Sequence, residues 1–412
     1  MKKGLELYVH IPFCARKCDY CDFLSAPADT ATKQKYVQAL ICEIKSRKRE
    51  FADYEVATVF VGGGTPSILA GEEIFRIFKA LRESFAFREN PEITMEVNPG
   101  TVTEEKFQFW KKAGVNRLSI GLQSADDREL KLLGRIHTFE DFLYTYETAR
   151  KSGFANINID LISALPGQSV SSWEKTLRKA AELSPEHISA YSLIIEEGTP
   201  FYKRYGASKE DGAPGDAESS GYEKAGASGG ESACDGERYP ALPDEDTDRL
   251  IYKTTGEILR EYGYVRYEIS NYAKEGYACR HNLGYWERKE YLGLGLGAAS
   301  LVNETRFKNT EELETYLEIF GEEKREYPSA VTERERLDTK EQMEEFMFLG
   351  LRKMKGISQR EFARQFGETL EEVYGEEIKE LTSEGLLEQE GEWLRLTEFG
   401  IDVSNYVFEK FF

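Results

Sequence analysis

The sequence predicts an α/β protein in which a partial (β/α)6 barrel is followed by a smaller C-terminal α+β domain with a winged-helix-like unit. Short apolar runs alternate with helical patterns through the first half of the chain. A stretch rich in Gly, Ala and Ser separates this half from further ordered segments. Two amphipathic helical patterns and a hairpin pattern come last. Strands that alternate with helices are typical of βα units with a parallel sheet.

Six runs rich in β-branched and aromatic residues are predicted to be the barrel strands. They cover residues 5–13, 57–63, 92–98, 117–123, 156–162 and 187–194. Helical patterns lie between them at residues 32–51, 72–85, 103–113, 139–151 and 171–183. A closed TIM barrel has eight such units, so we expect an open or partial barrel over residues 1–205.

Residues 206–240 differ from the segments on either side. Gly, Ala and Ser fill more than half of these positions and most of the others are charged. Such a segment cannot bury an apolar core, so we expect a disordered, low-complexity insertion. A helix is predicted to follow from Asp244 to about Tyr262. We expect residues 241–338 to extend the barrel and to connect it to the next domain.

Residues 339–412 are predicted to form the winged-helix-like domain. Helices over 357–367 and 370–385 precede a hairpin over 386–397. This pattern often binds DNA, but residues 341–412 carry 17 acidic and 8 basic side chains, which disfavours contact with phosphates. We expect this unit to pack against the barrel or to dock a partner.

The whole chain of 412 residues is acidic, with a formal net charge of -20. This charge repels phosphate backbones and anionic lipids, so no nucleic acid or membrane surface is expected as a partner. The first residues contain no apolar run typical of a signal peptide. The sequence also has no stretch of about 18 apolar residues, which a membrane-spanning helix needs. We therefore expect a cytoplasmic protein.

Three of the six cysteines lie together in the loop CARKCDYC, directly after the first predicted strand. Thiolates ligate iron, and Cys14, Cys18 and Cys21 can hold three irons of a [4Fe–4S] cluster. The fourth iron then stays open to a small ligand. Clustered thiols in a chain of this length favour a metal site over a secreted disulfide framework.

The alternative is a structural zinc site made by the three thiolates and His10, which lies four residues before Cys14. Structural zinc sites usually contain two CxxC pairs, and this chain has no second pair. A zinc-stabilised interaction protein is therefore the non-catalytic alternative, and metal analysis would separate it from an iron–sulfur protein.

Further candidate residues lie at the carboxyl ends of the predicted strands, where loops gather at one mouth of a barrel. GGGTPS (62–67) follows the second strand. Because its three glycines have no side chains, their backbone N–H groups can approach a ligand closely. Glu96 ends the third strand, Gln123 ends the fourth, and Asp160 lies in the fifth. Arg135 follows a short helix after the fourth strand. Each residue alone has a structural explanation, and their common location favours a binding site.

Four segments together resemble a known family: YVHIPFCARKCDYCDF, FVGGGTPS, LSIGLQS and NIDLISALPGQS. They are similar to the radical S-adenosylmethionine (SAM) enzymes of the oxygen-independent coproporphyrinogen III oxidase group, and within it to the HemW-type heme chaperones. The resemblance covers most of residues 5–200 and 241–400. It implies a radical-SAM barrel with a [4Fe–4S] cluster and bound SAM. In such proteins an electron from the cluster can cleave the sulfonium bond and release a 5′-deoxyadenosyl radical.

The resemblance implies roles for individual residues. Cys14, Cys18 and Cys21 would ligate the cluster, and Tyr8 and Tyr20 would line it. Seven residues would hold SAM: Gly63, Gly64 and Thr65 at its methionine part, Glu96 and Arg135 at its amino and carboxylate groups, and Gln123 and Asp160 at its ribose. Carboxylates accept hydrogen bonds from ammonium and hydroxyl groups, and arginine pairs with carboxylate, so these residue types suit the roles.

Two features favour the heme chaperones over the oxidases of the group. The oxidases have a further cysteine two residues after the third, where this chain has Phe23. HNLGYW (281–286) matches the HNxxYW motif of the chaperone branch. Histidine is an axial ligand of heme iron, and Tyr285 and Trp286 offer flat apolar area for a porphyrin. The resemblance thus implies heme as a cofactor with His281 as a ligand.

Cys279, two residues before His281, is a second candidate ligand for heme iron. The structural alternative is that His281 is a core histidine and that the aromatic residues beside it are ordinary packing.

We therefore expect a protein that binds heme, a [4Fe–4S] cluster and SAM and delivers heme to acceptor hemoproteins, such as respiratory ones. Contact with a membrane is expected only through such an acceptor. The alternative is a true oxygen-independent coproporphyrinogen III oxidase, which removes carbon dioxide from propionate side chains. Both functions use the same scaffold, so the fold alone does not separate them.

Overall fold

The computed structural model describes residues 2–206, 233–234 and 237–412. The expectation of a disordered insertion at residues 206–240 therefore lies largely outside the described residues. Within this part of the chain, none of the helices combines the length and the apolar character that a membrane crossing requires.

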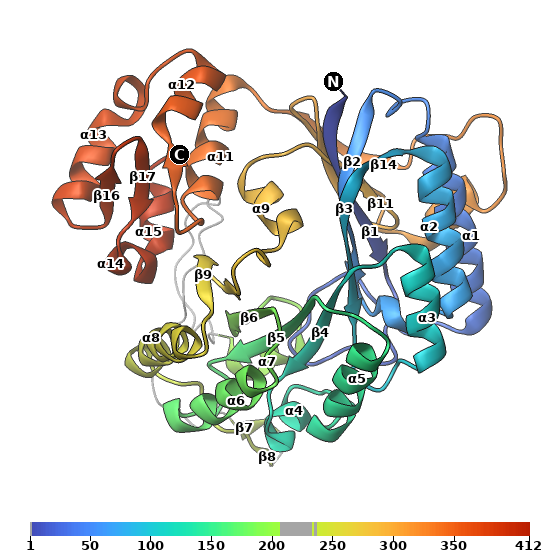
Figure 1. Cartoon of the computed structure of the whole chain (residues 1–412), viewed down its shortest axis with the longest axis horizontal. Coiled ribbons are helices and arrows are strands. Elements are labelled where there is room, and N and C mark those ends of the chain that lie inside the picture. Colours follow the sequence, from blue (N-terminus) through green and yellow to red (C-terminus); the bar gives the residue numbers. More distant parts are fainter. Residues whose placement is uncertain (1, 207–232, 235–236) are drawn as a thin grey trace.

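Six parallel strands form the centre of the molecule and confirm the predicted α/β barrel (Figure 1). Strands that are consecutive in the chain are also neighbours in the sheet. They are β1 (Lys3–Ile11), β2 (Tyr54–Gly63), β3 (Ala86–Val97), β4 (Arg117–Gln123), β5 (Ile157–Ser163) and β6 (His187–Ser192). Their carboxyl ends consequently lie at one edge, where the candidate residues were expected to meet.

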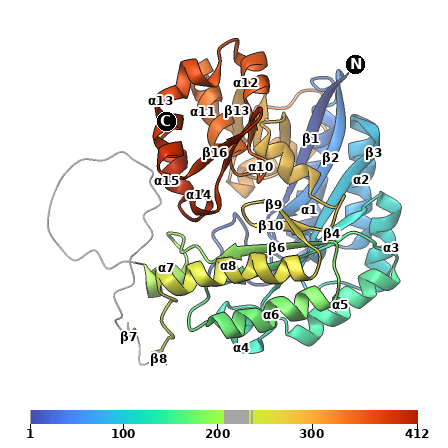
Figure 2. The same cartoon turned by 60° about the vertical axis from the view of Figure 1, so that its left-hand side comes forward.

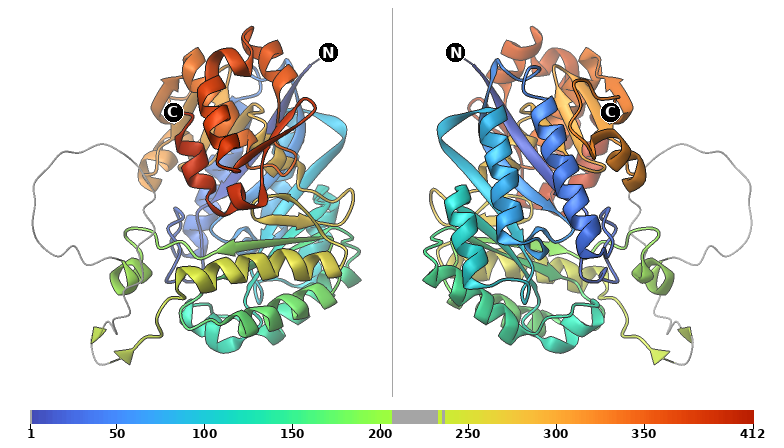
Figure 3. Two further views of the ribbon diagram at one scale, coloured as in Figure 1. Left: turned by 90° about the vertical axis from the view of Figure 1, so that its left-hand side faces the viewer. Right: turned by 90° about the vertical axis from the view of Figure 1, so that its right-hand side faces the viewer.

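Helices cover the outer face of this sheet, as Figure 1 and Figure 3 show. They are α1 (Thr30–Ser46), α2 (Gly71–Ser84), α3 (Glu104–Ala113), α4 (Asp127–Leu132), α5 (Phe139–Lys151) and α6 (Val170–Glu182), with a short 3-10 turn at Pro66–Ile68. Side chains of Asp29, Thr103, Thr138 and Ser169 accept backbone N–H groups in the first turns of α1, α3, α5 and α6. These caps satisfy N–H groups that have no partner within the helix.

Side chains along each barrel strand alternate between two environments, as a pleated strand requires. One set is apolar and packs under the helices; in β1 it is Leu5, Leu7, Val9 and Ile11. The other set is largely polar and faces the concave side; in β1 it is Glu6, Tyr8 and His10. The barrel interior is therefore suited to binding polar groups as well as to packing.

The sheet continues beyond both ends of the barrel, giving twelve strands in the order β14-β13-β12-β11-β1-β2-β3-β4-β5-β6-β10-β9. The hairpin β9 (Val265–Glu268) and β10 (Asn271–Ala273) pairs with β6. On the other side β11 (Tyr291–Leu294) runs parallel to β1 and leads into β12 (Ala299–Val302), β13 (Thr305–Asn309) and β14 (Val331–Arg336). This part of the chain also contains α7 (Pro200–Tyr205), α8 (Glu245–Glu261), which lies along α6 in Figure 2, and α10 (Leu313–Phe320).

The C-terminal unit has its own apolar core and the predicted winged-helix-like arrangement. Its helices are α11 (Thr339–Gly350), α12 (Gln359–Phe366), α13 (Leu370–Ser383), α14 (Glu398–Asp402) and α15 (Ser404–Glu409). The wing is a small antiparallel sheet of β15 (Ile357–Ser358), β17 (Trp393–Leu396) and β16 (Leu387–Glu390). The described residues also include the short strands β7 (Ala233–Cys234) and β8 (Glu237–Arg238), which pair with each other.

Helix α9 (Arg280–Trp286) lies on the concave side of the sheet, between the barrel strands and the C-terminal unit (Figure 1). Next to it, the Arg288 guanidinium donates to Glu304 and to Glu345 of α11, each at 2.8 Å. The Arg352 guanidinium lies 5.3 Å from the centre of the Trp286 ring. The motif HNLGYW is thus enclosed by both parts of the molecule.

Candidate functional site

The loop between β1 and α1 presents three cysteines at the mouth of the barrel. Cys14, Cys18 and Cys21 are partly accessible and form no disulfide. The Cys14 N–H donates to the Ala26 carbonyl at 3.1 Å, and the Cys21 N–H donates to the Cys18 carbonyl at 3.3 Å. The backbone of Asp19 is held in turn by the Leu133 carbonyl at the end of α4, at 3.1 Å. The loop therefore stays folded while its thiols remain open to a ligand.

The same region does not provide the zinc site that was considered as the alternative. His10 hydrogen-bonds through Nδ1 to the Tyr8 hydroxyl and through Nε2 to the Leu24 carbonyl, both at 2.9 Å. Across residues 2–206 and 237–412, no three His, Cys, Asp or Glu side chains are placed to hold one metal ion. A cubane cluster takes each thiolate on a different iron, so its cysteines need not converge on one point.

The turn after β2 lies directly against the end of β1. Its Thr65 N–H donates to the Phe13 carbonyl at 2.7 Å. Gly63 has a φ of +111°, and a Cβ at this position would lie 2.4 Å from the His10 ring. A Cβ on Gly64 would lie 2.7 Å from the Phe13 oxygen. Only glycine permits this approach, which leaves bare backbone beside the cysteine loop.

Glu96 lies across from this glycine turn, near the carboxyl end of β3. Its Oε2 accepts the Gly63 N–H at 3.1 Å, and a Cβ on Gly62 would lie 2.9 Å from its carboxyl carbon. Burial, and next the charge of Asp160, raise the pKa of Glu96 to about 8. A cationic group brought beside it would favour the carboxylate again, because an opposite charge stabilises the ionised form.

Gln123 and Asp160 lie on the neighbouring strands. Gln123 has a φ of +68°, which is uncommon for a side-chain-bearing residue and is found most often at functional positions. Its Nε2 lies 2.8 Å from where a Cβ on Gly121 would stand. Asp160 accepts hydrogen bonds from the Ser119 hydroxyl at 2.9 Å and from the Asn158 amide at 2.7 Å. The Asp160 side chain is therefore fixed in orientation beside the mouth.

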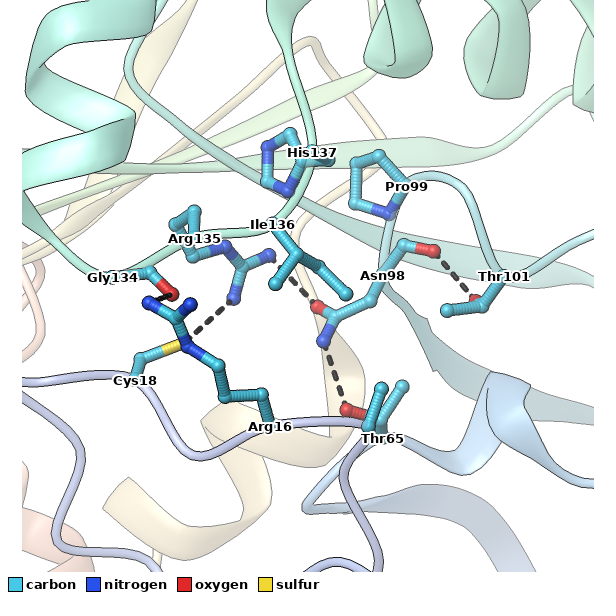
Figure 4. Close-up of a pocket in the computed structure, with 11 residues that line it drawn as sticks. Arg16, Cys18, Thr65, Asn98, Pro99, Thr101, Gly134, Arg135, Ile136 and His137 are labelled. Carbon is cyan, nitrogen blue, oxygen red and sulfur yellow. Dashed lines mark hydrogen bonds between the residues drawn. The ribbon is translucent and has the colours of Figure 1, made fainter.

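The Arg135 side chain borders the pocket at the mouth of the barrel, as Figure 4 shows. Its Nη2 donates to Asn98 Oδ1 and to the Gly121 carbonyl, both at 2.9 Å, and its Nη1 donates to Cys18 Sγ at 3.7 Å. The Tyr20 hydroxyl interacts with the same guanidinium. The pocket in this figure is lined by Ala15, Arg16, Cys18, Thr65, Asn98, Pro99, Thr101, Gly134, Arg135, Ile136 and His137.

Asn98 is the residue of this site that sequence reasoning missed. It follows Glu96 by two positions and lies one residue past the end of β3, so continued strand alternation directs it to the same side as Glu96. That alternation was the signal available in the sequence. Its amide bonds to both Arg135 and Thr65, so it joins two residues that were predicted separately.

His281 lies deeper in the barrel than the residues described so far. Its Nδ1 is 2.7 Å from the Thr58 hydroxyl, its Nε2 is 3.2 Å from the Tyr285 hydroxyl, and the residue is 1 % exposed. Burial, and next the positive charge of Arg117, lower the pKa of His281 to about 3. Neither ring nitrogen is free for iron in this arrangement. The arrangement matches the core-histidine alternative, and the role as a heme ligand stays a prediction.

Two neighbouring residues complete the surroundings of His281. The Phe60 ring stacks on His281 at 5.3 Å and on Tyr8 at 6.5 Å, so a single ring separates the motif from the mouth residues. Cys279, the second candidate heme ligand, is fully buried, and its thiol donates to Glu92 at 3.5 Å.

The residues at the mouth fit a [4Fe–4S] cluster with SAM beside it. The thiols, the glycine backbone, the Glu96 carboxyl and the Arg135 guanidinium are partly accessible and lie next to one another. A carboxyl and a guanidinium on facing sides of a thiol-bearing loop match an amino acid that carries both charges. His281 and Cys279, the two residues predicted as heme ligands, stand apart from this group.

Comparisons with known proteins show which proteins the chain is similar to. Residues 8–180 match the family model of the radical SAM superfamily, and residues 337–403 match that of the HemN C-terminal domain. The chain is 34% identical to the heme chaperone HemW of Lactococcus lactis, over 100% of this chain and 98% of that protein. It is 33% identical to the heme chaperone HemW of Escherichia coli, over 99% and 98%. The solved structure of the coproporphyrinogen III oxidase HemN from Escherichia coli has a TM-score of 0.79 at 24% identity, over 100% of this chain and 90% of that one.

Proposed function

The chain belongs to the HemW family of the radical SAM superfamily, and from this premise we propose that it is a heme chaperone. In this proposal it binds heme, a [4Fe–4S] cluster and SAM, and it delivers heme to acceptor hemoproteins, including respiratory ones. The observation that carries the proposal is identity of about one third over the full length to curated heme chaperones. The likeness to the solved oxidase concerns the fold only.

We assign the cluster to Cys14, Cys18 and Cys21, with Tyr8 and Tyr20 lining it. When bound, the cluster supplies single electrons and SAM supplies a sulfonium centre that such an electron can cleave. Seven residues of the mouth would hold SAM: Gly63, Gly64, Thr65, Glu96, Gln123, Arg135 and Asp160. Their support is the arrangement at the barrel mouth, where the backbone of the glycine turn, two carboxyls and one guanidinium lie near the cysteine loop.

Glu96 gives this assignment a pH dependence that can be measured. Its raised pKa, about 8, means that the free protein holds it protonated at pH 7. Binding of an ammonium group would favour the carboxylate, so binding releases a proton at pH values below 8. The affinity for SAM should therefore rise by up to about tenfold per pH unit below pH 8 and level off above it. Calorimetric titration with SAM from pH 7 to pH 9 measures this.

Glu96→Gln is the matched control for this titration. Gln keeps the size of the side chain and an oxygen that accepts the Gly63 N–H, and it does not titrate. The ionisation of SAM itself is common to both proteins, so the difference between the two pH profiles reports on Glu96. If the SAM affinities of the two proteins show parallel pH profiles, a contact between Glu96 and the SAM amino group is excluded.

We propose His281 as a heme ligand that must first leave its present partners. Its Nε2 would exchange the Tyr285 hydroxyl for iron, and the side chain would have to become accessible. In this proposal His281→Ala abolishes the heme-induced Soret band shift. Tyr285→Phe should instead tighten heme binding, by up to about fivefold, because it removes a competing hydrogen bond of about 1 kcal/mol. Titration of the purified chain with heme, followed by absorption, measures both effects.

His187→Gln is the control for this experiment, since His187 is a fully buried histidine of β6, outside α9 and outside the pocket of Figure 4. Equal Soret spectra and affinities for the wild-type chain and His281→Ala would exclude His281 as a ligand. The function itself is tested by mixing the heme-loaded chain with an apo-hemoprotein and following heme uptake by the acceptor. Anaerobic conversion of coproporphyrinogen III to protoporphyrinogen IX would contradict the chaperone proposal.

A further inference from the structure

Asn98 occupies the junction between the two sides of the candidate cofactor site. Its Nδ2 donates to Thr65 Oγ1 at 2.8 Å and its Oδ1 accepts Arg135 Nη2 at 2.9 Å (Figure 4). Thr65 comes from the turn after β2, and Arg135 comes from the segment between α4 and α5. One side chain thus connects two segments that are distant in sequence.

Each of these two partners also donates a hydrogen bond to a cysteine sulfur. The Thr65 hydroxyl donates to Cys14 Sγ at 3.4 Å, and Arg135 Nη1 donates to Cys18 Sγ at 3.7 Å. These sulfurs stand for the thiolates that the proposed cluster would use. The result is a chain of polar contacts from Cys14 through Thr65, Asn98 and Arg135 to Cys18.

The chemistry of the partners fixes which way the Asn98 amide points. A guanidinium only donates hydrogen bonds, so the amide atom facing Arg135 must be the oxygen. The NH2 group then faces Thr65, and its hydroxyl oxygen accepts that proton. The single proton of the Thr65 hydroxyl is thereby left for Cys14 Sγ.

We propose that Asn98 is a positioning residue that directs one hydrogen bond onto each of two cluster sulfurs. This inference rests on the proposed cluster site and deepens it. Hydrogen bonds to the sulfurs help to set the reduction potential of an iron–sulfur cluster. They stabilise the more negative, reduced state, so Asn98 keeps the midpoint potential higher than it would otherwise be. Through Arg135 it also holds the group assigned to the SAM carboxylate.

Asn98→Asp tests the direction of the hydroxyl without changing the size of the side chain. A carboxylate still accepts from Arg135, but it accepts from the Thr65 hydroxyl as well and so takes that proton away from Cys14 Sγ. It also adds a negative charge beside the cluster. We expect the midpoint potential of the reconstituted full-length protein to shift to more negative values. An anaerobic redox titration followed by electron paramagnetic resonance (EPR) of the reduced cluster measures the shift.

Two further variants separate positioning from a general disturbance of the fold. Thr65→Val removes the same sulfur hydrogen bond with little change of shape, so its potential should also fall. Asn98→Ala should weaken SAM binding roughly fivefold, because Arg135 loses one of its anchors. Asn90→Asp is the matched control, since it adds the same charge at an exposed position of β3, the strand that ends just before Asn98, and its potential should equal that of the wild-type protein.

The outcomes distinguish this inference from the proposed function. If the wild-type chain builds no cluster that depends on its cysteines, the proposed function itself fails. If the cluster forms fully but Asn98→Asp and Thr65→Val keep the wild-type potential, the positioning role of Asn98 is excluded and the cluster assignment stands. A shift of equal size in Asn90→Asp would also exclude it, because charge alone would then explain the effect.

Discussion

Serine at Cys14, Cys18 or Cys21 is expected to abolish the iron–sulfur chromophore of the anaerobically reconstituted protein. A hydroxyl is a far poorer iron ligand than a thiolate, and loss of one of three protein ligands leaves a cubane without adequate attachment. The three thiols are partly accessible and serve no core packing, so the variants should fold normally. Iron and sulfide analysis together with far-ultraviolet circular dichroism measures both parts of the expectation.

Cys42→Ala is the matched control for these variants. Cys42 is fully buried in α1, away from the cysteine loop, and its sulfur accepts a weak hydrogen bond from Gln38 at 3.7 Å. The control should retain the wild-type content of iron and sulfide. Retention of the chromophore in any one of the three serine variants would show that another residue supplies the missing ligand.

Glu43→Ala is expected to destabilise the fold by about 3 kcal/mol or more, because it leaves several buried donors without an acceptor. Glu43 is fully buried in α1. Its carboxylate accepts the Gly295 N–H at 2.8 Å, the Asn309 amide at 2.7 Å and the Tyr316 hydroxyl at 2.6 Å. Urea unfolding of the cluster-free protein measures the change in the free energy of unfolding.

The contacts of Glu43 also matter for the site. The loop it holds, around Gly295, packs so closely on β1 that a Cβ at Gly295 would lie 2.8 Å from the His10 carbonyl. The next glycine, Gly297, lies beneath Leu24 of the cysteine loop, 2.4 Å from its Cδ2 if a Cβ were added. We therefore expect Glu43→Ala to lower cluster content as well as stability.

Glu182→Ala is the control for this prediction, since Glu182 is an exposed residue near the end of α6 with no core contact. Its free energy of unfolding should stay within about 0.5 kcal/mol of wild type. A loss of similar size in both variants would mean that the Glu43 network contributes nothing beyond the general effect of removing a carboxylate.

The barrel could be predicted from the sequence because its strands carry a local pattern. Residues 117–123 and 139–151 were predicted as a strand and a helix with the bounds that the structure has. The alternation of helices and strands was enough to predict that the carboxyl ends of the barrel strands lie at one mouth. The strands added beside β1 were not predicted, because the short β11 and β12 carry too few residues for a period to show.

The candidate site could likewise be predicted from the sequence only in part. Glu96, Gln123 and Arg135 meet because strand ends converge, which the sequence pattern anticipates. The hydrogen bonds of Asn98 and the burial of His281 depend on contacts between segments far apart in the chain, which no local pattern encodes. His281 shows this most clearly: the motif around it predicts an iron ligand, while Thr58 of β2 and Tyr285 occupy both of its nitrogens.

The most direct test of the account is the EPR spectrum of the reduced, reconstituted protein recorded with and without SAM. We predict a [4Fe–4S] signal whose g values change when SAM is added, because SAM would bind at the open iron between the Gly63 turn and Arg135. Arg135→Ala should greatly reduce this change at the same SAM concentration. Identical spectra with and without saturating SAM would contradict the assignment of the barrel mouth as a joint site for the cluster and SAM.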